Sequence, residues 1–593
     1  MLSRVAAVKA PRTHSRRCVT GSSGRRREGG ESEPQRPNMS RHLFCFAVLL
    51  LVLVMVCCDT GGAAEAAGQA SEPKFEWKDV KDEEGETVES LGAPGLLKVG
   101  SDVFAVAEAQ CKKDSVIFTG VSSELLTETE DVEQKEVMKD AKDKTQFLEK
   151  EGSGEKKMDV SRPTTAVKGS DIYMLVGQYD SKGCPNSGAG GCELLLVKGS
   201  VSSVDASKKK IDWKGTESSP QRLDTQSDSW TKLIGSGGSG VKIKDDALVF
   251  PVEGTKKNGN EKDGKTVSLV LYLQGTESWT LSKGMSDGGC GDPSVVEWKD
   301  KKLMMMTACD DGRRRVYEIG DMGESWTEAL GTLSRVWGNK KGEGEKGVRS
   351  GFITATIDDD ENKRNVMLVT LPVYPEEEES KKETGNGKGK LHLWLTDNTH
   401  IVDIGPVSDD DVAASSLLYK SGKDGDNEKE ELIALYEKKK DGGKSSNSLW
   451  SVLLTAQLQR VKDVLATWKK VDDIVSKLCP SKSAVEDAPT GTPCSPTVKV
   501  TDGLVGLLSG NFSENTWSDE YLGMNATVKN NEGGNKAKLH EGGVKFTGAW
   551  AEWPVGSQGE NQLYHLRTTT SLLWRRCPST ICRRETPTFL CWV

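Results

Sequence analysis

The feature that most constrains the fold is a long series of short strand-like segments between about Ala105 and Thr455. Segments such as VFAVAEA, DIYMLVGQY, ALVFPVEG, KKLMMMTA and KLHLWLTD are alternating or continuously apolar, and clusters of Gly, Asp, Asn and Lys separate them. No long amphipathic pattern interrupts the series, and the 63 glycines outnumber the 20 prolines, as expected of a β-rich chain with many turns. So many strands need closure or radial repetition to protect their sheet edges, and the pattern therefore predicts a β-propeller.

A different pattern follows in residues 456–480. Apolar residues recur at helical spacing in LLTAQLQRVKDVLATWKKVDDIVSKLC, and Pro480 ends the pattern, so we expect a helix that links two domains. Strand-like runs such as VTDGLVGLLSGNFSENTW return after it and predict a second, smaller β domain. Asn511 and Asn525 begin Asn-X-Ser/Thr sequons and are candidate glycosylation sites on that domain.

The N-terminus predicts entry into the secretory pathway. A charged start precedes sixteen apolar residues, Leu43 to Cys58, and small residues follow, so residues 1–64 are interpreted as a leader and signal peptide. This apolar run is shorter than the roughly 20 residues that a membrane span needs, although a permanent anchor is the alternative. Met39 is an alternative start to Met1.

Secretion would place the cysteines in an oxidising compartment, where they can pair. Seven cysteines lie between residues 65 and 565, an odd number that leaves at least one thiol unpaired. Their spacing favours two local disulfides, Cys184 with Cys192 and Cys479 with Cys494. With six histidines, none of them at ligand spacing, the sequence predicts no metal site and no cofactor. The net charge of −9 and the lack of a basic stripe argue against nucleic acid as a partner.

The stretch EIGDMGESW, residues 318–326, has the composition of a tight turn between two strands. We expect the Asp321 side chain to bond backbone N–H groups ahead of it, Gly323 to adopt a positive φ, and Trp326 to fold back over the hairpin. Together with Ser325, these residues match the Asp-box of sialidases, S-x-D-x-G-x-[ST]-W. The related stretch QGTESW, at 274–279, has lost most of this pattern.

Nine segments extend the likeness to sialidases. GLLKVGSDVFAVAEAQC, VKGSDIYMLVGQY, SKGMSDGGCGDPSVVEW, DDGRRRVYE, DMGESWTEALGTLSRVWG, KLHLWLTDN, VLATWKKV, GLVGLLSGNFS and WPVGSQGENQLYH resemble the trypanosomal trans-sialidase superfamily. The resemblance implies an all-β architecture with three parts. These are a six-bladed sialidase-type β-propeller over 75–455, the linking α-helix at 456–480, and a lectin-like, concanavalin-type β-sandwich over 495–565.

The resemblance also implies where catalytic residues would lie. Enzymes of this class hold the carboxylate of the substrate on arginines and attack with a tyrosine that a glutamate activates. At six such positions, those of four arginines, one aspartate and the nucleophile, the sequence has other residues: Gly92, Gln110, Cys309, Lys388, Arg162 and Ala414. Two positions keep a carboxylate, Asp292 in place of the activating glutamate and Glu437 in place of a substrate-contacting glutamate. We therefore expect no catalytic residues.

The family pattern stops after His565. Residues 566–593, LRTTTSLLWRRCPSTICRRETPTFLCWV, are basic, contain cysteines and lack the expected strand pattern. We hypothesise a frameshift at Leu566. It would leave the β-sandwich truncated and remove the family's GPI-anchor signal, so the product would be secreted or retained in the secretory pathway.

With the catalytic positions substituted, the function that the resemblance implies is that of a non-catalytic surface or secreted glycoprotein in host-cell or matrix adhesion and immune evasion. The partners that the resemblance implies are host cell-surface or extracellular-matrix glycoproteins, and sialylated or galactosyl glycans. Two alternatives stay open. One is an exo-α-sialidase or trans-sialidase that cleaves or transfers terminal sialic acid, and the other is a truncated, pseudogene-like product.

Overall fold

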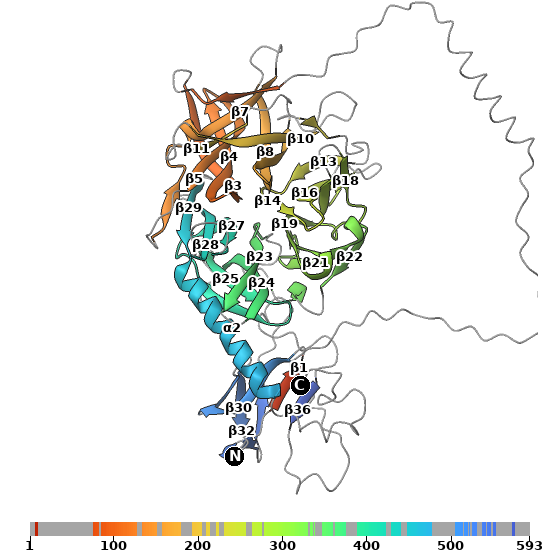
Figure 1. The fold of residues 1–593 in the computed structure, drawn as a ribbon, viewed down its shortest axis with the longest axis vertical. Helices are drawn as coiled ribbons and strands as arrows, with labels where there is room; N and C mark the ends of the chain where they lie inside the picture. Colours follow the sequence, from red (N-terminus) through yellow and green to blue (C-terminus); the bar gives the residue numbers. More distant parts are fainter. Residues whose placement is uncertain are drawn as a thin grey trace, which may run out of the picture. The chain divides into compact units, whose positions relative to one another are not determined.

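Strands dominate the computed structural model of this chain (Figure 1). The structure describes residues 6–9 and 572–575, residues 75–476 except 82–84, 127–132, 151–156, 180–192, 204–208, 214–220, 224–229, 257–263, 275–277, 330–332, 336, 338–346, 360–361, 375–387, 423–428 and 440–446, and residues 504–552 except 514, 520, 522–524, 531–536, 541–542 and 547–548. The predicted signal peptide lies outside the described residues.

Six blades of antiparallel strands form the propeller that the sequence predicts. The first two blades join in one sheet through β7 and β8. Blade 1 contains β2 (Phe75–Asp79), β3 (Glu86–Val99), β4 (Asp102–Lys113), β5 (Val116–Leu126) and β7 (Thr145–Lys150). Blade 2 contains β8 (Lys157–Lys168), β9 (Asp171–Tyr179), β10 (Glu193–Ser203), β11 (Lys209–Asp212) and β12 (Gln221–Arg222).

The other four blades are separate sheets. Blade 3 contains β13 (Trp230–Gly235), β15 (Val241–Lys242), β16 (Leu248–Lys256), β17 (Thr266–Gln274) and β18 (Ser278–Leu281), and β14 (Gly238–Ser239) leaves it to pair with β8. Blade 4 contains β19 (Cys290–Glu297), β20 (Leu303–Cys309), β21 (Arg314–Gly320) and β22 (Ser325–Glu328). Blade 5 contains β23 (Gly351–Asp359), β24 (Asn362–Val373), β25 (Lys390–Thr396) and β26 (Ile401–Pro406). Blade 6 contains β27 (Val412–Lys420), β28 (Glu431–Lys439), β29 (Asn447–Leu453) and β6 (Lys135–Val137).

The ring closes because one strand from the N-terminal part of the propeller completes the last blade. This strand, β6, lies between β5 and β7 in the chain but pairs antiparallel with β29 of the sixth blade, with Val137 opposite Leu449. This pairing protects a strand edge that would otherwise be exposed. The first strands β3, β8, β19, β23 and β27 surround the centre of the ring (Figure 1). Since side chains from facing sheets fill the space between blades, middle strands such as β20 are buried along their whole length.

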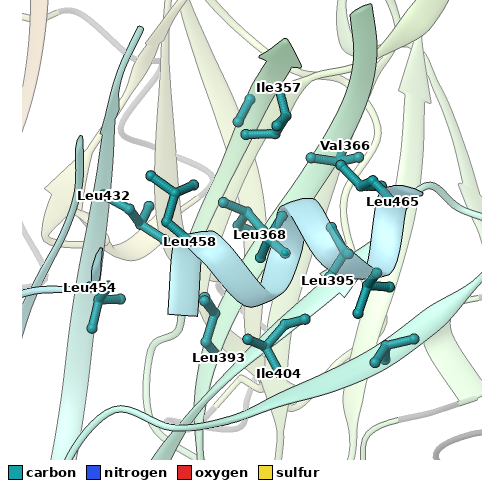
Figure 2. Close-up of a cluster of buried hydrophobic side chains, with 14 of the residues drawn as sticks. Ile357, Val366, Leu368, Leu393, Leu395, Ile404, Leu432, Leu454, Leu458 and Leu465 are labelled. Carbon is teal, nitrogen blue, oxygen red and sulfur yellow. The ribbon is translucent and has the colours of Figure 1, made fainter. Parts of the chain in front are cut away.

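The linking helix α2 (Thr455–Ser476) begins within one residue of its predicted start. Figure 2 shows how Leu458 and Leu465 of the helix lie over apolar side chains of blades 5 and 6, among them Leu368, Leu395 and Leu432. These side chains are buried, so the helix is held mainly by the apolar face that its periodicity predicted. Residues 477–480 lie outside the described residues. Within the described part of the chain, no helix has the length and apolar character needed to cross a membrane.

The C-terminal region is a β domain, as predicted, and it is consistent with a lectin-like sandwich. Its larger sheet has the order β35-β32-β31-β30-β1-β36, and β33 pairs with β34. The bounds are β30 (Leu504–Ser513), β31 (Thr516–Asp519), β32 (Ala526–Asn530), β33 (Lys538–His540), β34 (Gly543–Lys545) and β35 (Ala549–Glu552).

Two strands of this sheet lie where the sequence predicted none. β1 (Ala6–Lys9) belongs to the leader, and β36 (Leu572–Arg575) belongs to the tail that was expected to lack strands. β1 pairs with β30 on one side and with β36 on the other. The expectation of a tail without strands was therefore wrong for 572–575. LLWR is a short apolar run whose pairing partner is distant in sequence, so no local pattern announced it.

One disulfide joins two cysteines for which the sequence predicted no partner. Cys290 and Cys309 form a disulfide across β19 and β20, where they are direct antiparallel partners. Cys111 is a free, buried thiol. The four cysteines of the two predicted disulfides, at 184, 192, 479 and 494, lie outside the described residues, and those pairs stay predictions.

The two predicted glycosylation sites fall on strands or next to them. Asn525 is exposed just before β32, and its side-chain oxygen accepts a hydrogen bond from the backbone N–H of Asp519 at 2.8 Å. Asn511 lies within β30.

Candidate functional site

Three inner strands of the propeller have the same irregularity at the centre of the ring. β3, β8 and β19 each contain a bulge, and each bulge holds a residue with positive φ directly before a proline. These residues are Ala93, Arg162 and Asp292, with φ of 50°, 50° and 48°. A residue before proline normally adopts an extended conformation, so this geometry is strained and needs support from its surroundings.

Glutamates of neighbouring blades provide this support in blades 1 and 2. The backbone N–H of Ala93 in blade 1 donates to Glu437 Oε1 of blade 6 at 2.7 Å. The backbone N–H of Arg162 in blade 2 donates to Glu108 Oε2 of blade 1 at 2.7 Å. Each glutamate lies on the strand next to the innermost strand of the preceding blade, Glu437 on β28 and Glu108 on β4. The same contact therefore recurs around the ring.

A third contact of this kind links blades 3 and 4. The backbone N–H of Asp292 donates to Glu253 Oε2 at 3.0 Å, and Glu253 lies on β16, the second strand of the third blade. The carboxylate of Glu253 thus stabilises the bulge that carries Asp292. A hydrogen bond from a backbone N–H to a carboxylate is charge-assisted, and it is stronger than a hydrogen bond between two neutral groups.

The side chain of Arg162 adds an ion-pair network to these contacts. Its Nη1 lies 3.0 Å from Glu253 Oε2 and 3.1 Å from Asp292 Oδ1. Burial by itself would lower the pKa of Arg162, but the charges of Glu253 and Asp292 outweigh that effect and raise it. The guanidinium therefore remains charged and acts as the counter-ion of both carboxylates.

Two further arginines are buried near the same carboxylates. Arg314 on β21 donates from Nη1 to the backbone oxygen of Val348 at 2.6 Å, and Arg349, just before β23, donates from Nη2 to the backbone oxygen of Pro94. Burial lowers the pKa of each guanidinium to about 10, and the negative charge of Asp292 opposes this shift in both cases. Both arginines consequently stay protonated at neutral pH.

The pKa values of two glutamates at the centre are raised, in contrast to those of Arg314 and Arg349. Burial raises the pKa of Glu437, against the lowering effects of the Ala93 N–H and the Arg349 charge. Burial also raises the pKa of Glu108. Among the described residues, no group of three or more His, Cys, Asp or Glu side chains is arranged to hold a metal ion. The centre is therefore a network of internally satisfied carboxylates and guanidinium groups.

Two known protein families match this chain, one over the propeller and one over the C-terminal domain. The family described as BNR repeat-like domain matches residues 93–437, and the family described as trans-sialidase C-terminal domain matches residues 500–572. The chain belongs to the trans-sialidase superfamily. The family match extends to residue 572, seven residues beyond the point where the sequence pattern was thought to stop.

Among curated proteins, this superfamily member is similar to two Trypanosoma cruzi sialidases. "Sialidase 85-1.1" is 35% identical over 390 residues, which are 64% of this chain and 46% of that protein. A second protein named "Sialidase" is 31% identical over 421 residues, which are 68% of this chain and 32% of that protein. The chain spans less than half the length of both relatives.

Solved structures of Trypanosoma rangeli sialidase also match this superfamily member. Its complex with sialic acid has a TM-score of 0.59 and 28% sequence identity, and the match covers 81% of this chain and 70% of that one. The complex with 2,3-difluorosialic acid, described as a covalent intermediate, matches with the same TM-score, identity and coverage.

The structure places two of the family's predicted site positions, Gly92 and Ala414, beside a third, Glu437. A Cβ atom at Gly92 would lie 3.5 Å from Glu437 Oε1, and the backbone N–H of Ala414 is a further donor to the same carboxylate. Ala414 lies at the bulge of β27. The positions of an arginine and of the nucleophile are thus adjacent in space, and Glu437 is committed to backbone donors from both strands.

Arg162 and Asp292 are also together, in their ion pair, whereas the three other predicted positions lie elsewhere. Gln110 lies on β4, opposite Thr119 of β5, and Lys388 is exposed just before β25. Cys309 is taken up by its disulfide to Cys290. Five residues after Cys309, Arg314 has a guanidinium close enough to Asp292 to feel its negative charge.

The Asp-box turn forms as expected in its backbone and its tryptophan, but differs at the aspartate. Asp321, Met322 and Gly323 all have positive φ, and Trp326 Nε1 donates to the backbone oxygen of Gly323 at 3.2 Å. The Asp321 side chain is exposed, and the backbone oxygen of Asp321 accepts the Glu324 N–H at 3.2 Å where a side-chain bond was expected. The turn connects the outer strands β21 and β22, with Ser325 at the start of β22.

Sequence reasoning missed three residues of this network: Glu108, Glu253 and Arg349. A usable signal was present, because LGAPG, SRPT and GDPS each place a proline inside a strand-like run. Proline in a strand indicates a bulge. The partner of each bulge, in contrast, lies on another blade and leaves no local trace.

Proposed function

We propose that this chain is a non-catalytic, sialidase-fold glycoprotein of the cell surface or of secretions, and that it acts in host-cell or matrix adhesion and immune evasion. The observation that carries the non-catalytic part is the ion pair between Arg162 and Asp292 at 3.1 Å. A carboxylate neutralised by a neighbouring guanidinium is a poor general base. Ala414, at the position of the nucleophile, cannot attack a sugar.

The rate losses expected from these substitutions support the non-catalytic proposal. Loss of a nucleophile, a base or an electrostatic stabiliser costs on the order of 10² to 10⁴ in rate each. These losses are not additive, but at least four roles are affected together. The adhesion part of the proposal rests on the family resemblance. Its partners are host cell-surface or matrix glycoproteins and sialylated or galactosyl glycans.

A fluorogenic sialoside assay on the full chain tests the non-catalytic proposal. We expect no turnover above the rate of the buffer blank. Turnover that Asp292→Ala abolishes would refute the proposal, because it would show that this carboxylate works in catalysis. A matched Asp245→Ala variant is the control, since Asp245 lies on a surface turn and pairs with Lys301 at 2.8 Å.

Adhesion is tested separately by a glycan and matrix-protein binding screen with the soluble chain. We expect saturable binding to at least one host glycoprotein or glycan. Absence of binding across the screen would contradict the adhesion proposal and leave the non-catalytic one standing.

A second candidate is an exo-α-sialidase or trans-sialidase. It is supported by the two T. cruzi relatives and the T. rangeli structures, which are named sialidases, and by the carboxylates kept at Asp292 and Glu437. The same sialoside assay distinguishes it from the first proposal.

A further inference from the structure

Arg349 lies at the centre of the propeller, and its side chain and backbone contact groups from two other blades. Arg349 precedes β23 of blade 5, and its side chain is buried, with 6% of its surface exposed. Its Nη2 donates to the backbone oxygen of Pro94 in the bulge of blade 1. Its own backbone oxygen accepts the N–H of Ser415 in blade 6 at 3.2 Å.

The blade 3 segment leaves room for this side chain at Gly238. Gly238 has φ of +77°, which disfavours any other residue, and a Cβ atom built there would overlap the guanidinium of Arg349. The neighbouring Gly237 also has positive φ, +78°, and a Cβ there would come within 2.8 Å of Ala93 Cβ. The guanidinium of Arg349 therefore occupies space that a side chain at Gly238 would fill.

The charges around the guanidinium are complementary to it. Burial lowers the pKa of Arg349 to about 10, Glu437 of blade 6 and Asp292 of blade 4 oppose this shift, and the like charge of Arg162 adds to it. A buried cation is retained only where nearby negative charge and hydrogen-bond acceptors compensate for lost hydration. Here the Pro94 carbonyl and the two carboxylates provide that compensation.

We propose that the centre of the propeller is a guanidinium-binding site, which the chain fills with its own Arg349. The site consists of the Pro94 carbonyl and the space over Gly238, and Glu437 and Asp292 add negative charge through space. Once vacated, it takes a small alkylguanidinium ion. The inference goes beyond the proposed function, because it holds whether or not the chain cleaves sialosides.

Chemical rescue of Arg349→Ala in the full chain tests the proposal. The melting temperature, Tm, is measured with increasing methylguanidinium chloride, and methylammonium chloride at equal concentration is the control for charge and salt. The matched variant is Arg460→Ala, since Arg460 is an arginine exposed on α2. We expect a lower Tm for Arg349→Ala and a saturable rise of that Tm with methylguanidinium alone. Wild type and Arg460→Ala should show no such rise.

Equal shifts with both salts, or an unchanged Tm for Arg349→Ala, would overturn the proposal. If Arg349→Ala does not fold in plain buffer, it is refolded with each salt. Recovery of folded protein with methylguanidinium alone supports the site, and failure with both salts overturns it.

Gly238→Ala gives an independent test in two backgrounds. The strain from positive φ is the same in wild type and in Arg349→Ala, but the overlap with the guanidinium exists only in wild type. We therefore expect Gly238→Ala to lower Tm more in wild type than in Arg349→Ala. An equal loss in both backgrounds would show that Arg349 does not occupy the space over Gly238.

Discussion

Arg162→Ala is the most direct perturbation of the central network. The change removes the cation that lies 3.0 Å from Glu253 and 3.1 Å from Asp292, whose side chains are 5% and 19% exposed. At an effective dielectric constant of about 20, each contact contributes roughly 5 kcal/mol of gross attraction, much of which desolvation offsets. Breaking a buried pair by removing one partner typically costs about 3–5 kcal/mol, and we expect a loss of that size in the free energy of unfolding.

A double-mutant cycle with Glu253→Gln isolates the ion-pair term. Glutamine keeps an oxygen that can accept the Asp292 N–H but removes the charge, so Arg162→Ala should be less harmful in the Glu253→Gln background. We expect the two losses to fall short of additivity by about 1–3 kcal/mol. Urea unfolding of all four proteins, with comparison of midpoints and slopes, measures this coupling.

Arg460→Ala provides the control, because a change at an exposed position of α2 should stay within about 0.5 kcal/mol of wild type. Additivity of Arg162→Ala and Glu253→Gln would refute the reasoning. It would mean that Arg162 is not the counter-ion of Glu253, and the neutralisation of Asp292 would lose its support.

Three further predictions concern the cysteines and Glu437. Replacing Cys290 and Cys309 together by alanine should cost about 3 kcal/mol in urea unfolding, because their disulfide closes a loop with a sequence separation of 19; a change within error would show that it constrains nothing. Cys111 should resist alkylation by iodoacetamide in the native protein and react on unfolding, because burial raises its thiol pKa to about 12; rapid native labelling in mass spectrometry would contradict this. Glu437→Gln should gain stability relative to wild type as pH rises from about 4 to about 7. The pKa of Glu437 is raised in the native protein above its unfolded value of about 4.3, so in this range the native state binds more protons than the unfolded state. Wild type therefore loses stability as Glu437 ionises, whereas the glutamine variant does not. Urea midpoints that stay parallel across this pH range would contradict that assignment.

The sequence alone determined the classes of element and their order. The strand-like runs, the helical spacing that begins near Thr455 and the Asp-box turn at 321–326 are local patterns, and each formed where it was expected. Their physical basis is short-range, because side-chain periodicity and turn residues act within a few positions of the chain. The family resemblance rests on the same contiguous segments.

Only the tertiary structure decided which charged groups meet at the centre. Ala93 and Glu437 are separated by 344 positions, and Arg349 and Pro94 by 255, so no local pattern could pair them. The closing pairing of β6 with β29 joins the last blade to the first, which brings Glu437 to the bulge at Ala93. The pairing of Cys290 with Cys309 follows in the same way from the register of β19 and β20, which spacing along the chain does not encode.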